Sequence, residues 1–508
     1  MRIKFAFAIC FCAFIAWAGD SATTLARILE AKGAISATEF EQVQAASPDG
    51  RVAVLAALLE RKGLLTSSEA AVVRQNLTEV AFVPAVYTGA PPAAPIAPAP
   101  QQPSVNAKVE PGAVTAASKF PVTIYGTILL NSFFNTSRGN LEDVPLFAQA
   151  PNALGDDKNF GMTARQTRFG LRYQGGEIRG AKLSGAVELD LFGGKAAFGN
   201  GINMDMVRLR LAYGTLDWKH VSLTGGQDWS IFAPLNPTSL AEFAIPEFST
   251  SGNAWIRMPQ IRVDLHSAST SPTQVKLQLA AIDPNMGDYA PTVVNTVDFK
   301  NQRVTTVAVV ESGRAPGAGE RGRWPGAESR LEVKAKATDP DQNYTFGVST
   351  HYTHGKNSSA AGVQLPFDSW GVAGDYLLKF NKHFNLSGEV YAGRALGIFS
   401  VTAGFPVEAP GGPGDHGVLA RGGWAQAQFN LNPQWQTNFD YGAELPKASN
   451  LRAGDRVRNQ TFMWNLIYKY SPHVTFAWEL RRLRTDLLNT PTGNERGFHA
   501  NMAMAYVF

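Results

Sequence analysis

The chain of 508 residues is nearly devoid of cysteine, since Cys10 and Cys12 are its only two. Both lie in the first 18 residues, which we expect to be removed on export. A mature chain without cysteine can form no disulfide, and it offers neither a thiolate nucleophile nor a cysteine ligand for a metal. The sequence therefore excludes cysteine chemistry.

Long apolar runs are also missing. No internal stretch of 18 or more apolar residues occurs, so the sequence predicts no transmembrane helix. The early apolar stretch 5–15 is shorter, follows Arg2 and Lys4, and precedes Ala16-Trp17-Ala18, a small-x-small cleavage site. We interpret residues 1–18 as a secretory signal peptide.

Groupings of residues that would indicate catalysis or a bound cofactor are absent from the sequence. The 8 histidines do not group with a serine as a base and nucleophile would, and His351 and His354 are not spaced like a metal site. No glycine-rich phosphate loop precedes a helix, and the basic residues alternate with apolar ones. We expect no enzyme activity, cofactor, metal or nucleic-acid partner.

Residues 19–83 contain an internal repeat, in which Leu25 to Phe40 is matched by Leu55 to Ala70. Each copy predicts a helix that ends at a Lys-Gly pair and a second helix that begins with a capping-box spacing, Ser36 and Glu39 in the first copy. We expect periplasmic helical hairpins that dock on a periplasmic or cell-wall partner or mediate oligomerisation; a solvated spacer is the alternative. The Pro/Ala-rich residues 84–119 predict an extended linker.

Residues 120–508 show period-2 alternation, which predicts an all-β transmembrane barrel of about 16 antiparallel strands. Long and short connections alternate strictly between these segments, as they do between the two rims of an outer-membrane barrel. The predicted strands are 122–135, 165–174, 181–192, 204–214, 220–228, 257–267, 273–282, 329–338, 343–353, 367–379, 383–393, 419–430, 433–442, 460–471, 472–484 and 497–508.

The last segment, Gly497 to Phe508, places its aromatic and Met side chains on one face. It resembles the closing strand of a bacterial outer-membrane barrel. Tyr506 and Phe508 would then be the signal that the barrel-assembly machinery recognises. An edge strand of a soluble sheet is the alternative reading of these residues alone. The signal peptide and the loop alternation favour the barrel, with outer-membrane lipid around it.

Charged side chains alternate with apolar ones in several segments, and a charge that faces lipid at the bilayer midplane costs about 2–4 kcal/mol for arginine. The charged face should therefore line the lumen, where acidic neighbours would neutralise part of the arginine charge. The predicted lining residues are Arg168, Arg172, Glu188, Asp190, Arg208, Arg210, Arg257, Arg262 and Asp264.

The third long loop, 229–256, is too apolar for an external tip. We expect it to fold inward and narrow the channel; packing in a trimer contact or capping of the rim are the alternatives. Its predicted constriction residues are Trp229, Phe232, Pro234, Asn236, Glu242 and Trp255.

Four short elements resemble the DcaP-like family of outer-membrane porins, and the resemblance covers roughly residues 120–280 and the terminal strand. They are Tyr125-Gly126, Thr167-Arg-Phe-Gly170, Gly226-Gln-Asp-Trp-Ser-Ile-Phe232 and Arg257-Met-Pro-Gln-Ile-Arg262. The resemblance implies a trimer of 16-stranded barrels, a tethered periplasmic N-terminal segment and diffusion of small, often anionic solutes. Family members commonly begin with a coiled coil, whereas this chain has helical hairpins, so the resemblance does not extend to trimerisation through that segment.

The predicted function is passive diffusion of small hydrophilic solutes with a mild anion preference, since arginine suits carboxylate and phosphate groups. A sugar-preferring porin is an alternative, because Trp229, Phe232, Trp255 and Trp424 would offer an aromatic path. A non-conducting structural or adhesion barrel is the other alternative.

Overall fold

A computed structural model describes residues 26, 30, 35–46, 51–62, 121–152, 157–194, 205–268, 271–284, 292–298, 303–309, 316–336, 341–358, 364–399, 417–490 and 493–508. The predicted signal peptide and the linker lie outside these residues. The chain divides into two compact units, Met1–Ala94 and Pro95–Phe508. Within the described residues, no helix is both long enough and apolar enough to cross a membrane.

The first unit contains helices α3 (Ala37–Ala45) and α4 (Arg51–Arg61). The predicted capping box is present at the start of α3, where the Ser36 hydroxyl accepts a hydrogen bond from the Glu39 amide and the Glu39 carboxylate accepts one from the Ser36 amide. Lys62 lies 2.8 Å from the Glu39 carboxylate. These contacts, with the hydrogen bond to Lys62 the largest cause, lower the pKa of Glu39 to about 2. The second capping box lies outside the described residues.

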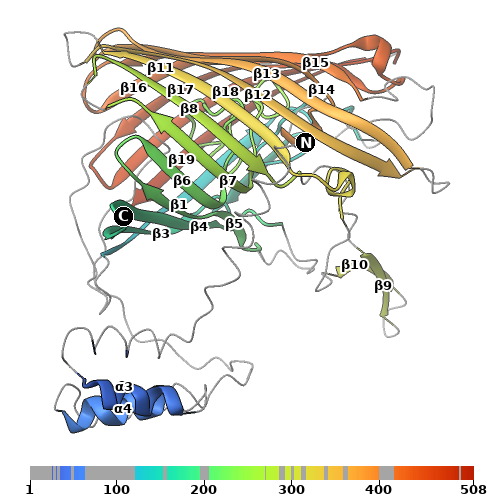
Figure 1. The fold of residues 1–508 in the computed structure, drawn as a ribbon. Coiled ribbons are helices and arrows are strands. Elements are labelled where there is room, and N and C mark those ends of the chain that lie inside the picture. The colour runs from blue at the N-terminus through green and yellow to red at the C-terminus, as the bar shows by residue number, and fades with distance from the viewer. Residues whose placement is uncertain are drawn as a thin grey trace, which may run out of the picture. The chain divides into compact units, whose positions relative to one another are not determined.

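The second unit is a closed barrel whose wall is formed by tilted antiparallel strands (Figure 1). The chain closes on itself because β1 pairs with both β19 and β3, and β8 pairs directly with β11. The strands are β1 (Val122–Asn135), β2 (Asn159–Thr163), β3 (Arg168–Ile178), β4 (Ala181–Asp190), β5 (Arg208–Asp217), β6 (Val221–Trp229), β7 (Arg257–His266), β8 (Thr273–Ile282), β9 (Thr292–Asp298), β10 (Arg303–Val309), β11 (Gly326–Lys336), β12 (Asn343–Ser358), β13 (Gln364–Lys379), β14 (Phe384–Arg394), β15 (Leu419–Asn430), β16 (Trp435–Pro446), β17 (Arg456–Lys469), β18 (Val474–Leu487) and β19 (Asn494–Val507).

The predicted all-β barrel is confirmed, and each of the 16 predicted segments corresponds to one wall strand. Three further strands were not predicted. β2 pairs with the carboxyl-terminal part of β1, from Asn131 to Asn135. β9 and β10 form a separate two-stranded hairpin within the connection between β8 and β11.

Two predicted connections are wrong in detail. Gly175 and Gly176 are not a turn but a bulge inside β3, where the register to β4 shifts between Gln174 and Glu177. The turn follows at Arg179-Gly180, both with positive φ. The expected long loop 354–366 is mostly strand, because β12 and β13 stay paired as far as Ser358 and Gln364.

The wall has an apolar outer face and a polar inner face. On β3, for example, Phe169 and Leu171 are exposed on the outside, whereas Arg168 is buried on the inside. β5 departs from the predicted alternation. A bulge shifts its register to β4 between Glu188 and Leu189, so Leu211 lies opposite Glu188 on the inner face, although the pattern placed it with Leu209 outside.

The carboxyl-terminal residue completes the seam between β19 and β1. Phe508 exchanges two backbone hydrogen bonds with Gly126, of 3.0 and 3.1 Å, and its ring covers the α-carbon of Gly126 so closely that a β-carbon there would collide with it. Phe169 packs against the same ring, and Phe508 is only 5 % exposed. Glycine at 126 is therefore required by this close approach.

Replacing Phe508 by Ala should destabilise the seam. Loss of a buried phenylalanine ring costs about 3–5 kcal/mol, and Gly126→Leu should have a similar effect because it occupies the space of the ring. The measurement is the thermal unfolding temperature of the barrel in detergent. Met504→Ala, on the lipid-facing side of the same strand, is the control and should change little; equal loss in both variants would contradict the seam.

Candidate functional site

The segment 230–256, here called the inner segment, folds into the barrel as expected and contacts the inner wall on many sides. Its backbone or side chains bond with Asn131 on β1, Glu328 on β11, Gln426 on β15 and Glu479 on β18. Most of the inner segment is buried; the residues that keep partial exposure are Pro234, Leu235, Asn236, Thr238, Ser239, Ile245 and Ile256. The inner segment is thus a fixed internal structure.

Two inward carboxylates hold the beginning of the inner segment. Glu328 accepts hydrogen bonds from the Ser230 hydroxyl at 2.8 and 2.9 Å and from the Ile231 amide at 3.1 Å. Glu389 accepts bonds from the Leu235 amide and, at 3.1 Å, from the indole of Trp424. A hydrogen bond contributes about 0.5–1.5 kcal/mol of net stability, so these carboxyl groups together fix the segment.

Arg481 holds the middle of the inner segment from β18. Its guanidinium pairs with Glu242, lies 3.9 Å from Glu247, and lies 3.4 Å from Glu479 on its own strand. The arginine and all three carboxylates are buried. One guanidinium therefore neutralises part of a buried group of carboxylates, and Glu242 acts as an anchor in the structure and does not project into open lumen.

The predicted arginine wall lies on the other side of the inner segment. Arg168 donates to the carbonyl of Phe243 at 2.6 Å, and Arg208 and Arg210 donate to the carbonyl of Ala244 at 2.8 and 3.2 Å. Two acidic residues of β4 pair with the same arginines, Glu188 with Arg210 at 2.6 Å and Asp190 with Arg208 at 2.6 Å. The cross-strand ladder of opposite charges is present.

Burial separates these arginines into two groups. Arg168 and Arg210 are 4 % and 1 % exposed, so they lie beneath the inner segment and do not line open lumen as predicted. Arg172, Arg208 and Arg262 keep partial exposure. The Arg172 guanidinium lies over the ring of Tyr125, whose hydroxyl donates to Glu188, and Arg262 pairs with Asp228 and Asp264 at 2.9 and 3.1 Å.

Arg257 was predicted to line the lumen, but it lies on the opposite strand parity from Gln260 and Arg262. Its guanidinium sits over the indole rings of Trp229 and Trp255, 4.6 and 5.0 Å from their centroids. The guanidinium nevertheless interacts electrostatically with Arg168, Arg208 and Arg210, so it stands with the arginines of the predicted wall while packing against the two indole rings.

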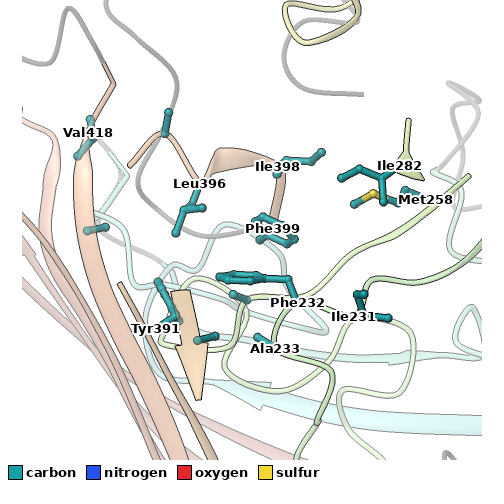
Figure 2. Packing of buried hydrophobic residues seen from close by; sticks show 14 of the residues in the cluster. Ile231, Phe232, Ala233, Met258, Ile282, Tyr391, Leu396, Ile398, Phe399 and Val418 are labelled. Atoms are coloured by element: carbon teal, nitrogen blue, oxygen red, sulfur yellow. The ribbon is translucent and has the colours of Figure 1, made fainter. Parts of the chain in front are cut away.

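One of the predicted constriction aromatics, Phe232, is packed in an apolar core inside the barrel. Phe232 is fully buried and packs against Phe399 with the two rings tilted and their centroids 4.7 Å apart (Figure 2). Phe399 belongs to a 3₁₀ turn, Gly397–Phe399, which begins the connection from β14 to β15 and also folds inward. Phe232 and Trp255 therefore stabilise the inner segment instead of facing the solute path.

Gly252 allows the end of the inner segment to touch the wall backbone. Its φ is +113°, and a β-carbon there would collide with the carbonyls of Gly423 on β15 and Ala443 on β16. Pro234 and Asn236, also predicted for the constriction, remain partly exposed, and Asn236 accepts a hydrogen bond from Asn253 at 3.1 Å. The partly exposed stretch from Pro234 to Ser239 is thus the edge left to meet a solute.

A cavity of about 540 Å³ lies between the stretch from Pro234 to Ser239 and the barrel rim that carries the short turns. Thr238 of the inner segment contributes to it, together with two inward lysines, Lys379 and Lys469. Lys382 and His383 add further basic groups, and amide side chains of Asn385, Gln428, Asn430, Asn432 and Gln436 complete the polar lining. None of the described lining residues is acidic.

Sequence reasoning missed the anchors Glu328, Glu389, Glu479 and Arg481 and the lysines of the cavity. A signal existed for the β18 pair, since Glu479 and Arg481 alternate with Trp478 and Leu480 just as the predicted charges do. Glu328 lay one residue before its predicted strand. Among the described residues, no group of three or more His, Cys, Asp or Glu side chains is arranged to hold a metal ion.

Arg481→Met should loosen the inner segment. Breaking a buried ion pair by removing one partner costs about 3–5 kcal/mol because the other charge stays buried. We expect a lower unfolding temperature in detergent and a noisier, larger single-channel conductance. Arg482→Gln, the outward neighbour on the same strand, is the control; wild-type stability and conductance in Arg481→Met would show that the inner segment does not depend on this anchor.

Comparison with known proteins finds similarity at the level of structure. No protein family and no curated protein matches the sequence. The fold is similar to that of the outer membrane channel DcaP of Acinetobacter baumannii, with a TM-score of 0.51 and 17 % identity over 77 % of this chain and 99 % of that chain. The anion-selective porin from Comamonas acidovorans aligns with a TM-score of 0.45 and 15 % identity over 77 % of this chain and 100 % of that chain. The chain therefore has the fold of an outer-membrane porin barrel, similar to that of DcaP.

Proposed function

We propose that the protein is a DcaP-like porin of the bacterial outer membrane, through which small hydrophilic solutes diffuse with a mild preference for anions. It acts without a cofactor and without catalysis. The fold and the exposed apolar outer face support the location, since such a face is stable only in contact with lipid. The observation that carries the preference is the basic, acid-free lining of the cavity below the inner segment.

The cavity supports anion entry because the charged residues in its described lining are basic. Lys379 and Lys469 face inward near the short-turn rim, and Lys382 and His383 lie in the adjoining turn. Rings of Lys or Arg favour anions in pores. The surrounding side-chain amides can donate hydrogen bonds to the carboxylate or phosphate group of such a solute. The many hydrogen-bonding groups of the cavity lining favour passage of a solute class over tight binding of one compound.

The partly exposed arginines would add to this preference deeper in the barrel. Arg172 and Arg208 keep access, but Arg208 shares Asp190 with Arg210 and its charge is largely balanced. The preference is therefore mild. A sugar path receives less support, because Phe232, Trp255 and Trp424 are buried in packing contacts.

We further propose a homotrimer, as the family resemblance implies. The outer face near β1 and β2 supports it, since Phe134, Phe160 and Met162 form an exposed apolar surface that a neighbouring subunit would cover. Sedimentation of the detergent-solubilised protein tests this point. Recognition of Phe508 by the barrel-assembly machinery and of the helical hairpins by a periplasmic partner stay predictions.

Lys379→Gln combined with Lys469→Gln should shift the reversal potential toward zero. In a salt gradient the wild type should favour chloride over potassium, and the lysines act over a Debye length of about 10 Å at 0.1 M salt but only about 3 Å at 1 M. The difference in reversal potential between the wild type and the double variant should thus be clear near 0.1 M salt and fade toward 1 M salt. Planar-bilayer recording of the purified protein measures it.

Lys447→Gln is the matched control, because Lys447 is an exposed lysine beyond the end of β16 at the opposite rim. It should leave the reversal potential unchanged. Cation selectivity in the wild type would contradict the anion preference while keeping the porin. A barrel that inserts into the bilayer without conducting would contradict the porin itself.

A further inference from the structure

Four buried carboxyl groups surround the Arg481 guanidinium where β18 meets the inner segment. Glu242 and Glu247 belong to the inner segment, whereas Glu479 lies on β18 and Asp440 on β16. Each of the four is at most 4 % exposed. Arg481 pairs with Glu242 and lies 3.9 Å from Glu247. It lies 3.4 Å from Glu479, and Asp440 interacts electrostatically with Glu247 and Glu479. We call these four carboxyl groups the acidic group.

The other polar groups around Arg481 do little to balance four negative charges. His499 of β19 interacts electrostatically with Arg481, and its ring is fully buried with Nδ1 2.7 Å from the side-chain oxygen of Asn135. A second positive charge beside the guanidinium is disfavoured there. The Ser239 hydroxyl donates to Glu479 at 2.7 Å, but it is neutral. With all of its members ionised, the acidic group would place four negative charges around one positive charge.

Hydrogen bonds are also too few for four ionised carboxylates. Among the described residues, no hydrogen bond reaches either side-chain oxygen of Glu247 or of Asp440. A buried carboxylate without partners is strongly unfavourable and takes up a proton instead. The carboxyl groups of Glu242 and Glu247 lie within hydrogen-bond reach of each other, and like charges at such a separation favour sharing of one proton. The acidic group is therefore stable only while it holds protons.

Release of the inner segment would give these protons up to water. Burial is the largest cause that raises the pKa of Glu242 from an ordinary value of 4.5 to about 7, and burial also raises the pKa of Glu247 well above its ordinary range. In a released segment both groups are solvated and return to ordinary values. The held segment thus binds more protons than the released one, so a rising pH favours release. The stability that the protons contribute is full below the ordinary pKa and is lost as the pH rises through about 7 and beyond.

We propose that the acidic group is a proton-dependent latch, which holds the middle of the inner segment at acidic and neutral pH and releases it at alkaline pH. Glu328 and Glu389 anchor the beginning of the inner segment separately, so release is confined to the stretch around Glu242 and Glu247. The effect on conductance rests on the porin function proposed above. The release itself does not depend on conduction.

A nitroxide spin label at position 245 measures the release directly. Ile245 lies between Glu242 and Glu247 and is partly exposed, and Cys10 and Cys12 both lie outside residues 120–508, so Ile245→Cys supplies the one thiol of the barrel. Electron paramagnetic resonance of the labelled protein in detergent reports the mobile fraction between about pH 6 and about pH 9. The ratio of mobile to immobile label should rise with pH, by up to about tenfold per pH unit for each proton released.

Glu247→Gln combined with Asp440→Asn removes two titrating groups and keeps their shapes. In this background the label should stay immobile across the same pH range. Glu495→Gln is the matched control, because Glu495 is a partly exposed inward carboxyl of β19 outside the acidic group, and it should respond to pH as wild type does. If the double variant does not fold, Glu247→Gln alone should reduce the response per pH unit by up to about tenfold, since one titrating group is lost.

Single-channel recording of the wild type should show a larger and noisier conductance at the alkaline end. Salt of about 1 M screens the cavity lysines beyond about 3 Å, so their own titration contributes little. A label that stays immobile throughout in wild type, or an equal pH response in wild type and the double variant, would overturn the latch. A pH-dependent label in a barrel that never conducts would support the latch and contradict only the porin function.

Discussion

The interior of this barrel is organised by the need of buried polar groups for partners. A wall strand places every second side chain inside, where Glu328, Glu389, Arg168 and Arg481 are removed from bulk water. The inner segment supplies what they lack. Its backbone amides meet the carboxylates on one side, and its carbonyls meet the arginines on the other. Neither the wall charges nor this irregular segment would be stable without the other.

This reciprocal bonding explains why most of the interior charge is structural. Arg168, Arg210 and Arg481 bond with the inner segment or with wall carboxylates. Their charges are therefore partly neutralised and attract a solute only weakly. Lys379 and Lys469 lie instead in a cavity whose described lining includes no acidic residue. The proposed selectivity and the scaffolding thereby fall to different residues on different strands.

The sequence predicted the barrel well because alternation is a property of each strand alone. Phe169 and Leu171 separate from Arg168 by parity, and 16 such segments with alternating loop lengths fit one architecture. Bulges defeated the same rule, since the extra residue near Leu211 reverses the faces of β5. The inward fold of residues 230–256 was predicted from their apolar content, but their partners were not. The pairing of Glu242 with Arg481 joins residues 239 positions apart and follows from tertiary packing that no local pattern contains.

The central claim is that the edge of the inner segment borders the path of solutes. A direct measurement is possible because Cys10 and Cys12, the two cysteines of the sequence, both lie outside residues 120–508. Thr238→Cys places a single thiol in the cavity lining, and Val348→Cys places one on the exposed outer face of β12. Single-channel conductance is recorded before and after a bulky thiol reagent is added. The account predicts a stepwise fall in conductance for Thr238→Cys and no change for Val348→Cys. Unchanged conductance in a fully labelled Thr238→Cys channel would contradict it.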